Sequence, residues 1–189
     1  MEKEVSAPQP GTLGNNQCPV CGRWQGTGHE AECRMWLAQK LASSLGGVMS
    51  GRKVKFYLSL AEAAALQGTC PRAQVGAIII NKDRVVSLGY NGSPRGTPHC
   101  EQAGCWMVEV EGVEHCLRSV HAETNAILNA AFGGAQTAGA VMVCTHRPCL
   151  RCYQAIINAG IEQVFFAKHY GDTGTDNLAA VSAVRLTEV

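Results

Sequence analysis

The apolar and polar positions of the chain predict alternating helices and strands from residue 52 onward. A broad apolar face along residues 52–67 predicts a helix. Two apolar runs, residues 75–80 and 84–88, flank the turn sequence Asn81-Lys82-Asp83 and predict an antiparallel hairpin. The polar, glycine-rich stretch at residues 89–119 comes next, and we expect a long loop with little secondary structure there.

The C-terminal half of the chain predicts a strand–helix–strand arrangement. The pattern predicts helices at residues 121–132 and 149–158, and strands at residues 140–144, 161–167 and 183–187. Parallel pairing with a right-handed crossover is required for the strands that flank the second of these helices. We therefore expect an α/β fold of three layers, with helices on both faces of a mixed five-stranded sheet.

The N-terminal residues predict a separate small zinc module. Residues 1–17 contain prolines, glycines and polar residues without periodicity, which is typical of a flexible tail. Residues 18–50 carry Cys18, Cys21, His29 and Cys33, whose spacing supplies a complete set of four zinc ligands. Few basic residues lie on the helix that bears His29 and Cys33, which favours a zinc-stapled extension over a nucleic-acid-binding finger. Residues 51–189 form the main domain.

Composition limits the classes of partner. The 189 residues are 46% hydrophobic and 16% charged, with a net charge of +1. This balance gives no electrostatic argument for a nucleic-acid or membrane surface. The sequence shows no signal peptide and no apolar run of membrane-spanning length, so we expect a cytoplasmic protein. Ten cysteines in a reducing compartment favour metal binding over disulfides.

One group of residues predicts a catalytic metal centre. His121, Cys149 and Cys152 supply three zinc ligands and leave a fourth position open for water. Glu123 follows His121 by two residues, which on a helix points the two side chains about 200° apart. Glu123 is therefore expected to move protons rather than to bind the metal. A structural zinc site and a CxxC redox pair are the alternatives, and both leave Glu123 unexplained.

Four further cysteines surround the expected long loop. They are Cys70, Cys100, Cys105 and Cys116. Because a loop of this length needs something to order it, we expect these thiols to hold a structural zinc ion, with His99 or His115 as alternates. The expected total is then three zinc ions, one catalytic and two structural. The alternative is four unrelated buried or free thiols.

With these motifs in place, residues 52–189 resemble the cytidine/deoxycytidylate deaminase superfamily, and specifically its deoxycytidylate (dCMP) deaminase branch. The superfamily carries H-x-E and P-C-x-x-C, here His121 to Glu123 and Pro148 to Cys152. The branch is identified by Cys70-Pro71-Arg72, GYNGSPRG at residues 89–96, His99-Cys100, Cys105, Cys116-Leu117-Arg118 and IINAG at residues 156–160. The sequence departs from the branch at Thr124 and Tyr153, where we expect changes at the edge of the pocket.

The resemblance implies zinc-dependent hydrolytic deamination of dCMP to dUMP, with Glu123 as the proton carrier. It also implies substrate contacts by Asn91, with Gly92 and Arg95 in a nucleotide-recognition loop and Tyr170 packing over the substrate. Some members of the branch have a second, structural zinc whose ligands match Cys70 and Cys100. Members of the branch are often hexamers regulated by dCTP and dTTP, so a homo-oligomer is expected.

Two other functions remain open from the sequence. One is deamination of another cytosine or adenine substrate, such as free cytidine, modified dCMP or a tRNA adenosine. Near-neutral charge counts against tRNA, and the long loop at residues 89–119 counts against free cytidine. The other is a nucleic-acid-binding zinc module on an inactive deaminase domain, against which Glu123 and the three ligands count.

Overall fold

The computed structural model describes residues 49–110, 113–169 and 173–189. The chain divides into two units, and the boundary falls after residue 48. The expected tail and nearly all of the expected zinc module, with Cys18, Cys21, His29 and Cys33, therefore lie outside the described residues, as does Tyr170. The second unit, residues 49–189, contains the whole range predicted for the main domain.

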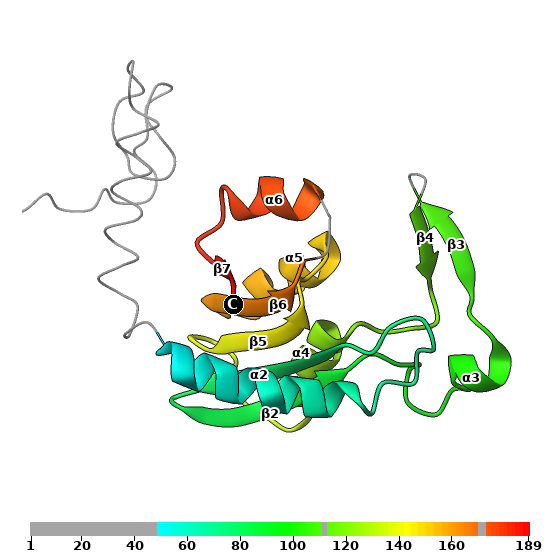
Figure 1. The fold of residues 1–189 in the computed structure, drawn as a ribbon, viewed down its shortest axis with the longest axis horizontal. Helices are drawn as coiled ribbons and strands as arrows, with labels where there is room; N and C mark the ends of the chain where they lie inside the picture. The colour runs from blue at the N-terminus through cyan, green and yellow to red at the C-terminus, as the bar shows by residue number, and fades with distance from the viewer. Residues whose placement is uncertain (1–48, 111–112, 170–172) are drawn as a thin grey trace, which may run out of the picture. The chain divides into compact units, whose positions relative to one another are not determined.

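The second unit alternates helices and strands in the predicted order (Figure 1). Among the described residues, no helix combines the length and the apolar character needed to cross a membrane. The elements are α2 (Gly51–Ala65), β1 (Gly76–Asn81), β2 (Arg84–Tyr90), α3 (Cys100–Ala103), β3 (Met107–Val110), β4 (Val113–Cys116), α4 (Ala122–Phe132), β5 (Val141–His146), α5 (Leu150–Asn158), β6 (Gln163–Lys168), α6 (Thr173–Ala179) and β7 (Arg185–Glu188).

The central sheet has five strands in the order β2-β1-β5-β6-β7. Strand β1 pairs antiparallel with both β2 and β5, whereas β5 with β6 and β6 with β7 are parallel. The hairpin between β1 and β2 turns at Lys82 and Asp83, whose φ angles of 50° and 61° are left-handed. This combination confirms the predicted mixed sheet.

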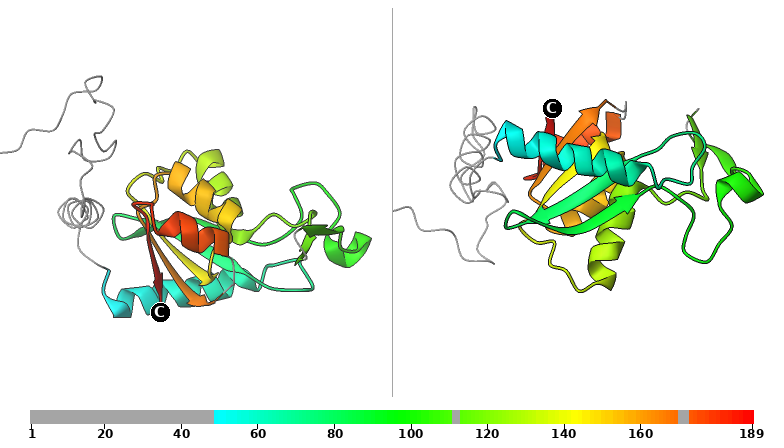
Figure 2. Two further views of the ribbon diagram at one scale, coloured as in Figure 1. Left: turned by 90° about the horizontal axis from the view of Figure 1, so that it is seen from above. Right: turned by 60° about the horizontal axis from the view of Figure 1, so that its bottom comes forward.

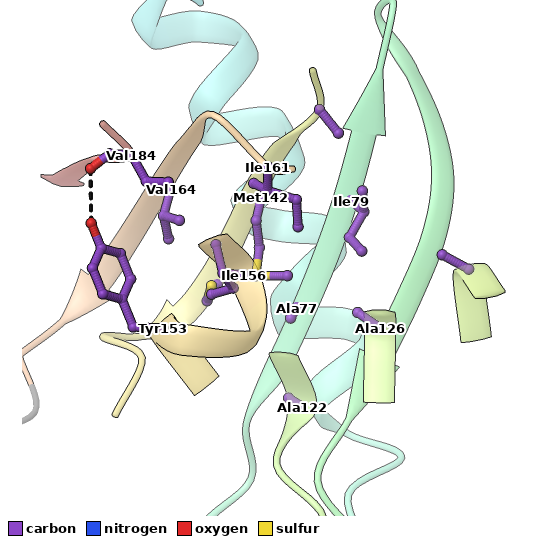
Figure 3. Close-up of a cluster of buried hydrophobic side chains, with 13 residues drawn as sticks. Ala77, Ile79, Ala122, Ala126, Met142, Tyr153, Ile156, Ile161, Val164 and Val184 are labelled. Carbon is purple, nitrogen blue, oxygen red and sulfur yellow. Dashed lines mark hydrogen bonds between the residues drawn. The ribbon is translucent and has the colours of Figure 1, made fainter. Parts of the chain in front are cut away.

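Helices lie on both faces of the sheet (Figure 2). A cluster of buried apolar side chains lies between the sheet and the helices on each face. Side chains of a strand point alternately to opposite faces, so Ile78 and Ile80 of β1 pack with α2. Ala77 and Ile79 pack on the other face, with α4 and α5 (Figure 3). The three-layer α/β/α architecture is therefore confirmed.

Glycines let two helices approach the sheet closely. A Cβ atom on Gly76 would lie 1.9 Å from the carbonyl oxygen of Ala61 in α2. A Cβ atom on Gly89 would lie 2.3 Å from the carbonyl oxygen of Ala122 and from the backbone nitrogen of Ala126. Any side chain at Gly89 would push away the first turns of α4, and that end of α4 carries the predicted catalytic residues.

The predicted loop at residues 89–119 contains more structure than expected, and the prediction of a largely irregular loop is wrong. It includes α3 and the separate two-stranded sheet β3–β4, which extends away from the main sheet (Figure 1). We call the described residues 98–110 and 113–119 the arm. In the hairpin, Met107 pairs with Cys116 and Glu109 with Glu114. Strands of four residues with charged side chains between valines give too short an alternation to be recognised as a hairpin.

Tyr153 anchors the C-terminal segment and does not border the catalytic cavity, contrary to our expectation. Its buried hydroxyl donates a hydrogen bond to the carbonyl of Val184 at 2.8 Å (Figure 3). The same hydroxyl lies 2.8 Å from the hydroxyl of Ser182. The contact ties α5 to the chain that enters β7. Tyr153 therefore stabilises the folded domain by holding the C-terminal segment to α5.

We expect Tyr153→Phe to lower the free energy of unfolding by about 0.5–1.5 kcal/mol, because it removes the shorter of two hydrogen bonds to the Val184 carbonyl, the other coming from the Ser182 hydroxyl at 3.4 Å. Deaminase activity should remain unchanged. Chemical denaturation of the single variants Tyr153→Phe and Ser182→Ala and of the double variant would measure the coupling. Additive effects of the two substitutions would contradict this arrangement.

Candidate active site

Two helix N-termini bring the predicted metal ligands together. His121 is the N-cap residue of α4, and Cys149 is the N-cap residue of α5. Cys152 lies in the first turn of α5 and is buried. Unpaired N–H groups at a helix N-terminus stabilise thiolates, so the start of α5 is a suitable place for two cysteine ligands.

The distances between the three side chains fit a tetrahedral zinc ion. His121 Nδ1 lies 3.5 Å from Cys149 Sγ and 3.4 Å from Cys152 Sγ. All three ligand atoms lie within 4.8 Å of one another. Zn–S and Zn–N bonds of about 2.3 and 2.0–2.1 Å at tetrahedral angles place N and S about 3.6 Å apart. The residues therefore fit zinc, with one coordination position left open to the cavity.

Glu123 lies beside this ligand set with its side chain almost fully enclosed. It is 3% exposed and follows the N-cap His121 by two residues. Burial raises the pKa of its carboxyl group to about 6. A carboxyl group with this pKa exchanges protons readily near neutral pH, which is the property needed of a general acid and base.

The two cysteines of α5 have opposite pKa shifts. The hydrogen bond from the Cys152 thiol, together with that of His121, lowers the pKa of Cys149 to about 4. The same contact with Cys149, reinforced by burial, raises the pKa of Cys152. Cys149 is therefore a thiolate at neutral pH. The Cys152 sulfur also lies 3.5 Å from the hydroxyl of Thr124. Thr124, one of the two positions at which the sequence departs from the dCMP deaminase branch, thus contacts a predicted metal ligand.

A cavity of about 270 Å³ opens onto these residues. This is close to the lower end of the range for small-molecule sites, about 300–1,000 Å³. Its wall combines the two helix N-termini, the loop before β1, the end of β5 and strand β4 of the arm. The lining residues are Cys70, Arg72, Ala73, Val75, Asn91, Glu114, His115, Cys116, Ser119, His121, Ala122, Glu123, His146, Arg147 and Cys149.

The family model for the cytidine and deoxycytidylate deaminase zinc-binding region matches residues 52–168. The chain belongs to this deaminase family. The matched range includes every element from α2 to β6 and the whole ligand set, so the family accounts for most of the second unit.

Several relatives of the deaminase family are similar to this chain. ComE operon protein 2 of Bacillus subtilis is 42% identical over 116 residues, which are 61% of this chain and 59% of that protein. The deoxycytidylate deaminase of Schizosaccharomyces pombe is 32% identical over 141 residues, 70% of this chain and 42% of that protein. The chain thus spans about half the length of these relatives.

The fold of the family is also seen in solved structures. The dCMP deaminase of cyanophage S-TIM5, solved in complex with dCMP and dUMP, superposes with a TM-score of 0.64 at 28% identity. The match covers 75% of this chain and 100% of the phage chain. The apo form of the phage enzyme gives a TM-score of 0.60 at 26% identity.

Of the predicted substrate residues, the structure places Asn91 at the cavity. Its side-chain oxygen accepts a hydrogen bond from the backbone N–H of Val75 at 2.8 Å. Its side-chain nitrogen donates to the carbonyl of Ala73 at 2.7 Å. Asn91 therefore holds the loop before β1, and only its remaining hydrogen-bonding capacity is left for a ligand.

Gly92 and Arg95 lie away from the cavity wall. Gly92 exchanges backbone hydrogen bonds with Val120, and a Cβ atom on it would lie 2.7 Å from Thr69 Oγ1. The guanidinium of Arg95 is exposed and lies 5.1 Å from the centre of the Phe132 ring, at the far end of α4. Within residues 89–96, Gly89 and Gly92 therefore serve close packing.

Sequence reasoning did not predict four of the charged or titratable residues in the cavity wall: Arg72, Glu114, His146 and Arg147. Arg147 is buried and forms an ion pair with Asp176 of α6. His146 also lies in the wall, and its Nδ1 atom is 2.9 Å from the hydroxyl of Thr145. The available signal was position, because His146 ends β5 and Arg147 directly precedes Pro148 and Cys149.

The arm gathers three of the four predicted structural cysteines. Ligand atoms of Cys100, Cys105 and Cys116 lie within 4.8 Å of one another, and we call these residues the arm cluster. The Sγ atoms of Cys100 and Cys116 are 3.8 Å apart, which equals the separation expected for two thiolates on one zinc ion, about 3.8 Å. Burial raises the pKa of Cys100 to about 11.

The other candidate ligands lie outside the arm cluster. Cys70 is buried in the cavity wall, and His115 lies in that wall as well. The Nδ1 atom of His99 is buried without a hydrogen-bond partner among the described residues. Of the four predicted cysteines, the structure therefore brings three together and leaves Cys70 outside the arm cluster, and the ligand set of a structural zinc ion stays a prediction.

Proposed function

We propose that the protein catalyses the hydrolytic deamination of dCMP to dUMP and ammonia. The observation that carries this proposal is the buried carboxyl group of Glu123 beside His121, Cys149 and Cys152 in one small cavity. A purely structural metal site has no use for a buried proton carrier. Relatives named deoxycytidylate deaminase, and a similar structure solved with dCMP and dUMP, support this nucleotide as the substrate.

The residues of the cavity divide the reaction between them. Zinc, when bound, supplies the Lewis acidity that makes water nucleophilic at neutral pH. Glu123 accepts the proton that the attacking water gives up and passes it to N3 of the cytosine ring. The C4–O bond forms in this first step. Glu123 then takes the proton of the new C4 hydroxyl and gives it to the amino group at C4, so that the C4–N bond breaks and a C4 carbonyl remains. Uracil and ammonia are the products.

A panel of cytosine compounds tests this proposal. Purified protein would be assayed for ammonia release from dCMP, CMP, deoxycytidine, cytidine and dCTP. We expect the highest kcat/KM with dCMP. A higher value with free cytidine, or turnover of none of the five compounds, would overturn the assignment of the substrate.

The pH dependence follows from the protonation state of Glu123. Its raised pKa of about 6 means that the carboxylate, which accepts the proton of water, is lost as the pH falls through this value. A metal cation at the three ligands lowers this pKa in turn. We expect kcat/KM for dCMP to fall below about pH 6 and to be level from there to neutrality. A fall that begins above pH 7 would contradict the role of Glu123.

We also propose that the arm cluster holds a structural zinc ion, and that the N-terminal cysteines hold another. Metal analysis of the full-length protein should then give three zinc ions per chain. The variant Cys100→Ser/Cys116→Ser should lose one of them, because a zinc ion with fewer than three protein ligands is weakly held. Cys144→Ala, at a buried cysteine of β5, is the matched control and should keep all three. An unchanged zinc content in the double variant would contradict an arm zinc.

Assembly into a hexamer and regulation by dCTP and dTTP stay predictions of the family resemblance. Together with the proposed activity, they would place the protein at a regulated step of pyrimidine deoxynucleotide supply.

A further inference from the structure

Thr124 contributes a hydroxyl group to the metal centre that the proposed reaction does not use. It follows Glu123 in the first turn of α4. Its Oγ1 atom lies 3.5 Å from the Sγ atom of Cys152, which is in the first turn of α5. This contact therefore joins the two helices that carry the three predicted metal ligands.

The chemistry of the two groups fixes which of them donates the hydrogen bond. A cysteine that binds zinc does so as a thiolate, which has lost its proton and can only accept. The hydroxyl of threonine has a proton to donate. When Cys152 is a metal ligand, Thr124 is therefore the donor. A hydrogen bond to an ionised acceptor is roughly twice as strong as one between neutral groups.

Cys152 needs such a donor more than Cys149 does. Cys149 is partly exposed, so water can solvate the charge on its sulfur. Cys152 is 2% exposed, and a buried charge without hydrogen bonds is costly. Thr124 therefore supplies a donor at the sulfur that water reaches less well.

Both helices are fixed at the ends that carry this contact. On α4, the side-chain nitrogen of Asn125 donates a hydrogen bond to the carbonyl of Tyr90 at 2.7 Å, directly after Thr124. On α5, the residue after Cys152 is Tyr153, whose hydroxyl is bonded to the C-terminal segment. The hydroxyl and the sulfur are therefore held at hydrogen-bonding distance by the fold on both sides.

We propose that Thr124 is a positioning residue of the metal centre, whose hydroxyl donates a hydrogen bond to the Cys152 thiolate and thereby strengthens the binding of the catalytic zinc ion. This inference rests on the proposed function, because it concerns the metal of the same site. Groups that hydrogen-bond to a metal ligand orient it and tune its charge. Thr124 acts through Cys152 and needs no contact with the substrate.

The first measurement is the zinc affinity of Thr124→Val and Thr124→Ser, determined by competition with a chromophoric chelator in the full-length, zinc-loaded proteins. Valine has nearly the shape of threonine but no hydroxyl, whereas serine keeps the hydroxyl. Thr124→Val should lower the affinity of the catalytic site by about 10- to 100-fold, the usual loss when a hydrogen-bond partner of a metal ligand is removed. Thr124→Ser should stay close to the wild type.

Two further variants make this measurement specific. Cys149→Ala lacks a ligand of the catalytic ion, so its release curve shows the zinc ions of the other sites. Thr187→Val makes the same chemical change on β7, outside the cavity wall and outside both metal clusters. It is the matched control and should release zinc as the wild type does.

Cobalt(II) in place of the catalytic zinc gives a second readout. The thiolate-to-cobalt absorption band reports on hydrogen bonds to sulfur, because a donor lowers the energy of the sulfur lone pairs. In difference spectra against Cys149→Ala, Thr124→Val should shift this band to longer wavelength. Thr124→Ser and Thr187→Val should leave it where the wild type has it.

The proposal requires both results. A Thr124→Val variant with the zinc affinity or the band position of the wild type would overturn the role of the hydroxyl. An equal loss in Thr124→Val and Thr124→Ser would assign the effect to side-chain packing, and would overturn it as well. Failure of the proposed function looks different, because the wild type would then not deaminate dCMP. Neither measurement needs a substrate, so both decide the role of Thr124 in that case too.

Discussion

Glu123→Gln should lower kcat for dCMP by at least about 10²–10⁴-fold, the usual contribution of a positioned proton carrier. Glutamine has nearly the same shape as glutamate but cannot accept the proton of the attacking water. Because Glu123 lies outside the group of candidate metal ligands, we expect the zinc content to equal that of the wild type. Kinetics with dCMP and metal analysis of the same preparation measure both properties.

A matched control separates catalysis from folding. Glu62→Gln changes an exposed carboxylate on α2, on the opposite face of the sheet from α4, and should leave kcat and zinc content unchanged. If Glu123→Gln retained a kcat within a few fold of the wild type, Glu123 would not be the proton carrier. Loss of zinc from this variant would mean that the carboxylate is a ligand after all.

Cys149→Ala should remove the catalytic zinc ion and, with it, all measurable deamination. The variant leaves His121 and Cys152 as the only protein ligands, and two ligands hold zinc far more weakly than three. Zinc content should fall by one ion per chain, and the loss of activity should persist when zinc is added at micromolar concentration. Inductively coupled plasma analysis with an ammonia assay tests both statements.

Cys144→Ala is again the matched control, since Cys144 is buried in β5 and belongs to neither metal cluster. It should keep zinc and activity. A Cys149→Ala variant with normal zinc content would show that the ion is held elsewhere, and the account of the cavity would then be wrong.

The main sheet could be predicted because its signal is local. The run of isoleucines in β1 is buried on both faces, so it stands out against the polar turn at Lys82 and Asp83. The helix N-termini were equally clear, because Pro148 and Cys149 start α5 directly after a strand. Patterns of this kind lie within a single helix or strand, so they can be recognised in the sequence without knowledge of the fold.

The cavity wall could not be predicted in the same way. Arg72, Glu114 and Arg147 come from three separate segments, and only the folded chain brings them to one cavity. From the sequence, the family resemblance indicated Gly92 and Arg95 as parts of a nucleotide-recognition loop instead. In the structure, the close contact of Gly92 with Thr69 accounts for one of those glycines by packing instead.

The arm shows a second limit of sequence reasoning. Its cysteines indicated a metal site, but their spacing in the sequence does not say which of them bind the same metal ion. The pairing of Met107 with Cys116 brings β3 and β4 together, and Cys116 then lies 3.8 Å from Cys100. Cys70 fits the sequence pattern equally well, yet it lies in the cavity wall outside the arm cluster.

The most direct measurement is the product analysis of dCMP incubated with the purified, zinc-loaded protein. Chromatography of the nucleotides and an enzymatic ammonia assay would be run on the same samples, with Glu123→Gln in parallel. Our account predicts dUMP and ammonia in equal amounts from the wild type, and essentially none from the variant. Unchanged dCMP with the wild type, or equal product from both proteins, would contradict it.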